Sequence, residues 1–87
     1  MHAVVVNVTI NDRDAATSSL REDVVPRVSG APGFKAGYWI GLEGGKGTSI
    51  IVFDSEDAAR GAASQIQPPG DFVTFDSVEV GEVVANA

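Results

Sequence analysis

The order of the apolar patterns along the chain constrains the fold more than any other feature of the sequence. Residues from about His2 to Ile10 alternate as a strand does. An amphipathic helical pattern follows, and then come two strand patterns joined by a glycine-rich turn, a second helical pattern and a last strand. The chain therefore consists of two halves of about forty residues with the same order of elements, although no clear residue-level repeat links them.

The first strand has one wholly apolar face, which consists of Val4, Val6, Val8 and Ile10. Its other face carries Ala3, Val5, Asn7 and Thr9, a mixed set rather than the charged face of a solvated sheet. We therefore expect both faces of this strand to be covered.

A four-residue spacing of apolar side chains marks the first helix. Asn11 and Asp12 offer a helix cap. The apolar stripe is formed by Ala16, Leu20, Val24 and Val28. Pro26 lies inside this pattern, where it removes a backbone donor and crowds the preceding turn. We expect a kink or break near Val25, followed by an irregular last turn that runs to about Ser29.

The second half begins with a hairpin. Strands are predicted from about Phe34 to Leu42 and from Gly47 to Phe53, because two apolar runs flank the tight turn Glu43–Lys46 with its pair of glycines. Asp54 or Ser55 is expected to cap the next helix.

The inner face of this second helix consists of small side chains: Ala58, Ala59, Ala62, Ala63 and Ile66. The segment Gln67–Gly70, with two prolines, is predicted to end the helix. The last strand is expected from about Phe72 to Val84, with a bulge near Asp76 and Ser77, where the alternation slips.

The predicted fold class is α+β: a single domain over residues 1–87 with a ferredoxin-like βαββαβ order, a four-stranded antiparallel sheet and two helices on one face. The other sheet face would then be bare. Its candidate residues are Val5, Tyr38, Ile51 and Phe53. A bare apolar face predicts a partner, and the simplest partner is a second copy of the chain.

Composition excludes several classes of function. Six basic residues against twelve acidic ones give a net charge of −6, which disfavours binding to nucleic acids and anionic membranes. Without cysteine there is no disulfide, thiolate metal site or cysteine nucleophile, and the single histidine, His2, cannot hold a metal alone. We expect no metal and no cofactor. The first residues do not resemble a signal peptide, so a cytoplasmic location is expected by default.

Three stretches of the sequence carry a family resemblance. They are the valine-rich first strand, the segment Ala31-Pro32-Gly33-Phe34, and the segment from Val52 to Ala58 with the sequence VFDSEDA. The chain resembles the dimeric α+β barrel superfamily over nearly its whole length, in particular the antibiotic-biosynthesis-monooxygenase-like members. The resemblance implies a homodimer in which two sheets face each other and enclose a cavity.

Members of that superfamily include cofactor-free monooxygenases that act on aromatic polyketides, haem-degrading enzymes, isomerases, and proteins with no known reaction. The haem-degrading branch uses an asparagine on the first strand, a tryptophan at the end of the third and a histidine on the second helix. Asn7 matches the first position, but Phe53 replaces the tryptophan and the helix 55–66 has no histidine. Haem degradation is therefore disfavoured, and the monooxygenase interpretation is weakened.

The candidate ligand-binding residues are Asn7, Tyr38, Trp39 and Phe53. Tyr38 and Trp39 are neighbours on one strand, so they point to opposite faces. If Leu42 pairs with Gly47, Tyr38 lies opposite Ile51 and enters the cavity, while Trp39 packs against the first helix. A shift of one residue exchanges the two.

Each candidate also has a structural explanation. Asn7 orients a ligand carbonyl or hydroxyl, or it bonds a neighbour in a half-buried sheet. Both aromatic residues of the second strand also suit core packing. Arg21 and Arg60 are interpreted as solvated helix residues rather than anion clamps.

Three hypotheses for the function follow. The first is a cofactor-independent oxygenase or isomerase acting on a small aromatic molecule. The second is a non-catalytic protein for small-molecule binding or stress response. The third is an interaction module with a packed interior. An open cavity of a few hundred cubic ångströms would keep the first two, whereas a filled interior would favour the third.

Overall fold

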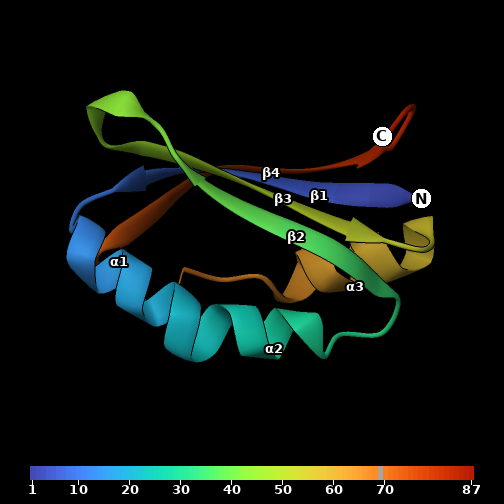
Figure 1. Cartoon of the computed structure of the whole chain (residues 1–87), viewed down its shortest axis with the longest axis horizontal. Coiled ribbons are helices and arrows are strands. Elements are labelled where there is room, and N and C mark those ends of the chain that lie inside the picture. The colour runs from blue at the N-terminus through green and yellow to red at the C-terminus, as the bar shows by residue number, and fades with distance from the viewer. Residues whose placement is uncertain (69) are drawn as a thin grey trace.

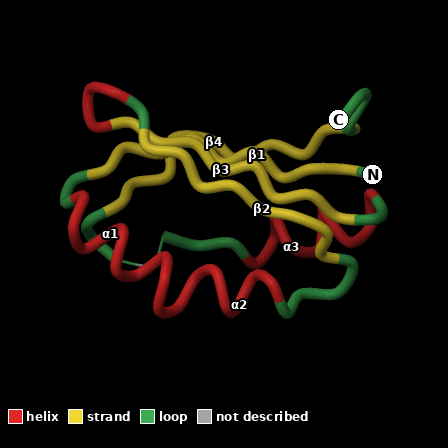
Figure 2. Tube along the Cα trace, in the orientation of Figure 1, coloured by secondary structure: helices red, strands yellow, loops and turns green. Residues whose placement is uncertain are grey.

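Four antiparallel strands form one sheet in the order β2-β3-β1-β4 (Figure 1). They are β1 (His2–Ile10), β2 (Phe34–Gly41), β3 (Lys46–Phe53) and β4 (Val73–Glu82). The coordinates are a computed structural model that describes residues 1–68 and 70–87. Figure 2 shows the longer helices α1, α2 and α3 on one face of the sheet, and no described helix covers the other face. The predicted α+β class and antiparallel sheet are confirmed.

The first helical segment is interrupted where the sequence predicted a disturbance. It consists of α1 (Arg13–Ser19), a π-helical turn η1 (Leu20–Val24) and α2 (Val25–Ser29). The Asp12 carboxylate caps α1 by accepting a hydrogen bond from the Ala15 N–H at 3.1 Å. In η1 the Val25 N–H donates to the Leu20 carbonyl, five residues back. The wider turn accommodates Pro26 because it relaxes the crowding that a proline ring causes one turn earlier. Residues up to Ser29 form a regular helical turn rather than the irregular one expected.

The hairpin between β2 and β3 closes one residue earlier than the predicted pairing. Gly41, rather than Leu42, is the partner of Gly47. The connection contains a short 3-10 turn, η2 (Glu43–Gly45), in which Gly44 and Gly45 both have φ of +74°. Such backbone angles favour glycine, so this pair fixes the geometry of the turn and with it the register.

The register corrects one expectation about the faces of the sheet. Ile51 lies opposite Val4, and Phe53 lies opposite His2. Ile51 and Phe53 therefore face the helices, where they are 3% and 0% exposed, and their assignment to the bare face is wrong. The run Ile50–Phe53 is apolar at every position, so it shows no apolar–polar alternation that would predict which residues face the helices. A shift of one residue in the strand pairing moves each of these side chains to the other face.

The second helix, α3 (Glu56–Gln65), lies close to the sheet because its inner side chains are small. The Ser55 hydroxyl caps it by accepting a hydrogen bond from the Ala58 N–H at 3.1 Å. Ala59 is fully buried and joins the core cluster, whose members are Val4, Val6, Ile51, Phe53 and Ala59. Ile66 has an extended backbone and ends the helix. The predicted stop at 67–70 includes residue 69, which lies outside the described residues.

The last strand contains the predicted bulge. Asn7 pairs with Ser77 and Val8 pairs with Phe75, so Asp76 is the extra residue on β4. The bulge confirms the slip in alternation seen in the sequence. No helix within the described residues is long and apolar enough to cross a membrane.

Candidate functional site

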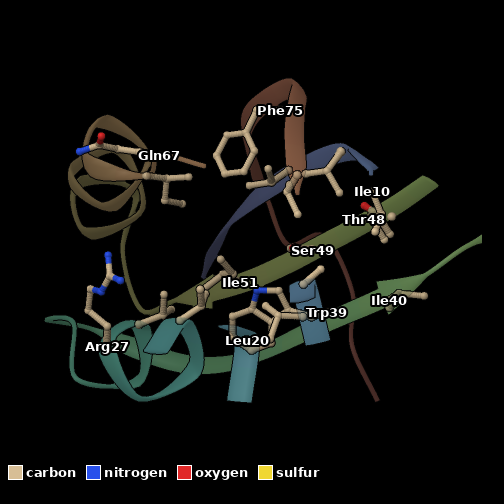
Figure 3. A pocket seen from close by; sticks show the side chains of 18 of the residues that line it. Ile10, Leu20, Arg27, Trp39, Ile40, Thr48, Ser49, Ile51, Gln67 and Phe75 are labelled. Carbon is tan, nitrogen blue, oxygen red and sulfur yellow. The ribbon is translucent and has the colours of Figure 1, made fainter. Parts of the chain in front are cut away.

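A cavity of about 490 Å³ lies between the helices and the sheet (Figure 3). The apolar stripe of the first helical segment lines it from one side: Ala16, Leu20, Val24 and Val28. The helix-facing residues of the sheet line it from the other: Val6, Val8, Ile10, Trp39, Ile51, Phe53, Val73 and Phe75. The interior between these two layers is therefore open.

The cavity is open because many of its lining residues are small. They include Ala16, Ala31, Gly41, Gly47, Ser49 and Ala62. Protein interiors are normally packed as densely as organic crystals, and a layer of small side chains facing a sheet cannot reach that density unless the layers approach closely. The alanines of α3 allow such an approach near Ala59, whereas the first helical segment presents the larger side chains of Leu20, Val24 and Val28 to the cavity.

Trp39 provides one aromatic wall. It lies opposite Ser49 on the helix side of the sheet, two residues from Gly37 on the same face. A Cβ at Gly37 would lie 2.8 Å from the Trp39 ring, so this glycine leaves room for the indole to lie along β2. Phe75 of β4 provides a second aromatic wall across the cavity (Figure 3).

Tyr38 lies on the other face of the sheet. Its partner is Ile50, not the expected Ile51, and its side chain is 61% exposed. Tyr38 nevertheless points away from the helices, as expected. The hairpin register is shifted by one residue, so Tyr38 pairs with Ile50, and Ile50 rather than Ile51 lies on the helix-free face. Tyr38 and Trp39 therefore belong to two separate surfaces.

Asn7 also lies on the helix-free face. Its Nδ2 donates a hydrogen bond to Ser77 Oγ at 3.0 Å. Nearby, Thr9 Oγ1 donates to Asp76 at 2.9 Å, and Lys46 Nζ lies 3.6 Å from the same carboxylate. Asn7 is thus part of a polar strip along β1 and β4, and the sheet separates it from the cavity.

Phe53 lies at the base of the cavity as part of the core. Its ring packs edge-on against Phe34, with centroids 6.3 Å apart and an interplanar angle of 81°. Of the four candidate residues, the structure brings Trp39 and Phe53 together at the cavity and leaves Asn7 and Tyr38 on the opposite face. Sequence reasoning missed Phe75, although its alternation with Val73 before the bulge was a usable signal.

Polar groups at the cavity can donate hydrogen bonds but offer no strong base. Those on the helix side of the sheet are Arg13, Thr17, Arg21, Arg27, Trp39, Ser49, Gln65 and Gln67. Among the described lining residues there is no aspartate, glutamate or histidine. No group of three or more possible metal ligands occurs among the described residues either. The site is therefore suited to holding and orienting a molecule rather than to removing a proton from it.

Arg13 lines the cavity near the end of β2. Its Nη2 donates to the Leu42 carbonyl at 3.2 Å. A Cβ at Gly41 would lie 2.5 Å from its Nη1, so glycine at this position lets the guanidinium rest on the end of β2. This arginine is thus held by the backbone.

The clearest pKa shift in the protein lies away from the cavity. Arg60 donates a hydrogen bond to Glu56 at 2.8 Å on α3, and this bond with the arginine's charge lowers the pKa of the Glu56 carboxyl below its ordinary value of 4.5. An exposed pair one helical turn apart explains the shift without a functional role.

No family model matches the sequence, and no curated protein matches it either. Fold and cavity together define an α+β protein with an internal apolar site between its sheet and its helices.

Proposed function

We propose that the protein binds a small, flat, largely apolar molecule in the cavity between its helices and its sheet. The observation that carries this proposal is the open volume of about 490 Å³ with aromatic walls from Trp39 and Phe75. Ligand sites in proteins commonly have volumes of about 300–1,000 Å³ and apolar linings with a few polar groups. A flat aromatic body matches such walls, since stacked and edge-on aromatic contacts add to the gain from burial.

Binding is favoured over catalysis by the polar groups present. Ser49 and Thr17 offer hydroxyls, and the amides of Gln65 and Gln67 can donate or accept. These groups would orient a ligand, but none has the basicity needed to abstract a proton at neutral pH.

A cofactor-free monooxygenase or isomerase acting on an aromatic substrate is the second candidate. It is supported by the aromatic cavity and by the resemblance to the monooxygenase-like dimeric α+β barrels. Its test is substrate-dependent oxygen uptake with aromatic phenols, measured in protein treated with chelator. Uptake that persists in wild-type protein and is lost in Ser49→Leu would support catalysis in the cavity, whereas no uptake above buffer would leave binding alone.

The chain offers its own reporter for the binding test. Trp39 is the single tryptophan, and it lines the cavity, so its fluorescence reports on occupancy. The neutral dye N-phenyl-1-naphthylamine is expected to quench Trp39 in a saturable way. Ser49→Leu places a larger side chain beside Trp39 and is expected to weaken this binding.

Ser77→Leu is the matched control for this test. It makes the same substitution on the helix-free face, where Ser77 contacts Asn7, and it should leave dye binding unchanged. Equal binding by wild type and Ser49→Leu would contradict a ligand site in the cavity.

We also propose that the chain is a ferredoxin-like member of the dimeric α+β barrel superfamily and forms a homodimer through its helix-free sheet face. The strand order and the placement of the helices are compatible with this topology. That face carries an apolar patch, called here the open-face patch, which consists of Val5, Ala36, Tyr38, Ile40, Ile50 and Val52. Tyr38 and Ile40 are the most exposed of its side chains, at 61% and 43%.

The dimer is tested by light scattering at micromolar concentration. Wild type is expected at twice the mass of one chain, and Ile50→Asp, which places a charge in the open-face patch, is expected as a monomer. Ser64→Asp adds the same charge on an exposed turn of α3 and should stay dimeric. A monomeric wild type would overturn the dimer and leave the cavity proposal unaffected.

A further inference from the structure

We infer that the ligand is an amphipathic anion: a flat apolar body with one carboxylate-like or sulfonate-like group, held at the cavity mouth by Arg21 and Arg27. This inference rests on the proposed binding function and names the chemical class of the ligand.

The distribution of charge around the cavity is the first observation. The chain has six basic and twelve acidic residues. Three of the basic ones, Arg13, Arg21 and Arg27, line the cavity, whereas none of the acidic ones does among the described residues. Although the protein has a net charge of −6, the charged side chains that line this cavity in the described part of the chain are all cations. Such a local field favours an anionic ligand group over a neutral or cationic one.

The positions of the arginines are the second observation. Arg21 and Arg27 are exposed and yet line the cavity, so they lie where it meets solvent. Figure 3 shows the Arg27 guanidinium and the Gln67 amide at one end of the cavity, beyond the side chains of the two layers. A ligand whose apolar body lies between Trp39 and Phe75 would present a charged end there.

The partners already bound to each arginine decide which of them is available. Arg13 donates to the Leu42 carbonyl at the far end of the cavity. Arg27 forms an ion pair with Asp23, four residues earlier on the same segment. Within the described residues, no ion pair involves Arg21. Arg21 is therefore the first anchor for an anionic group, and Arg27 adds a second guanidinium that must share its donors with Asp23.

Guanidinium groups suit this role because their planar donors bind both oxygens of a carboxylate or sulfonate. Solvent screens the contact, since both arginines are exposed. We expect each to contribute roughly three- to tenfold in affinity, as exposed ion pairs do.

A matched pair of dyes tests the inference. 8-Anilinonaphthalene-1-sulfonate and N-phenyl-1-naphthylamine share the same apolar body, and only the first carries an anionic group. Both are titrated against Trp39 fluorescence in the full chain. Wild type is expected to prefer the sulfonate, and the preference should fall with added salt. Arg21→Gln and Arg27→Gln should each weaken sulfonate binding roughly three- to tenfold and leave the neutral dye unchanged.

Arg60→Gln is the control, because it removes one positive charge from the outer side of α3, where Arg60 pairs with Glu56. It should leave the dye preference unchanged. The double variant Arg21→Gln/Arg27→Gln should abolish the preference altogether.

The outcomes separate the two proposals. Saturable binding of the neutral dye without any advantage for the sulfonate would overturn the anion inference and leave the cavity function standing. Failure of both dyes to quench Trp39 would overturn both proposals. Equal losses in Arg60→Gln and Arg21→Gln would also sink the inference, because the effect would then follow net charge alone.

Discussion

At the scale of single residues, side-chain placement depends on register more than on residue type. Phe53 and Ile51 are apolar and would suit either face of the sheet. Both face the helices because Phe53 pairs with His2 and Ile51 pairs with Val4. The sequence predicted the opposite face because the run Ile50–Phe53 is apolar throughout. Only a neighbour of known orientation, here Val4, determines the face of such a run.

The Glu56–Arg60 pair gives the protein a small pH dependence. The folded-state pKa of Glu56 lies below its ordinary value of 4.5 because of Arg60, so its contribution to stability is present above that value. The contribution is lost as the pH falls from there through the lowered pKa. We expect the difference in free energy of unfolding between wild type and Glu56→Gln to be present at neutral pH and to vanish at the acid end, measured by urea unfolding at a series of pH values.

Glu22→Gln serves as the comparison, because it removes the same charge from an exposed residue with no ion-pair partner among the described residues. If both variants show the same pH profile, the dependence belongs to the net charge and not to the Arg60 contact.

At the scale of elements, the π-helical turn follows from the spacing of the apolar stripe. Four residues exceed one α-helical turn by about 40°, so a stripe with strict four-residue spacing drifts around an ideal helix. A wider turn at Leu20–Val24 takes up part of this drift. All four stripe residues from Ala16 to Val28 consequently line the cavity. Both Pro26 and the four-residue spacing of the stripe thus favour a wider turn, and the sequence contains both signals.

Substitution of glycine by alanine is expected to change the free energy of unfolding in opposite directions at Gly44 and at Gly61. Gly44 has φ of +74° in the hairpin turn, and a Cβ there would meet no atom within 4 Å, so only backbone strain opposes alanine. Gly44→Ala is expected to lower the free energy of unfolding by about 1–2 kcal/mol. Gly61 lies inside α3 with equal space, and Gly61→Ala is expected to raise it by roughly 0.5–1 kcal/mol.

Chemical denaturation of both variants checks this pair. A stabilising Gly44→Ala would show that the turn is not held at positive φ, and a destabilising Gly61→Ala would show that the outer face of α3 is covered in solution.

At the scale of the whole molecule, element order was predictable and the site was not. The caps at Asp12 and Ser55 and the bulge at Asp76 have local signals, and the structure contains all three. The cavity has no local signal, because it depends on how far the first helical segment lies from the sheet. Small side chains such as Ala62 and Ser49 fit a closely packed interface as well as an open one, and only the assembled layers distinguish the two.

A folding-coupled dimer makes thermal stability depend on concentration. If the open-face patch is buried by a second copy, the melting temperature should rise as the protein is concentrated from about 1 μM to about 100 μM, because mass action favours the bound state. Differential scanning fluorimetry over this range measures the effect. Ile50→Asp should remove the dependence, and a concentration-independent wild type would argue against coupling between folding and pairing.

The strand order also leaves two strands, β2 and β4, each with one unpaired edge. β4 carries a bulge and the charges of Asp76, Glu79 and Glu82, devices that discourage a foreign strand from adding to a sheet. The eight residues of β2 contain a single charge, on Lys35, beside three aromatic residues and Ile40. Protection against fibrillar aggregation is therefore distributed unevenly, and along β2 it depends on one lysine.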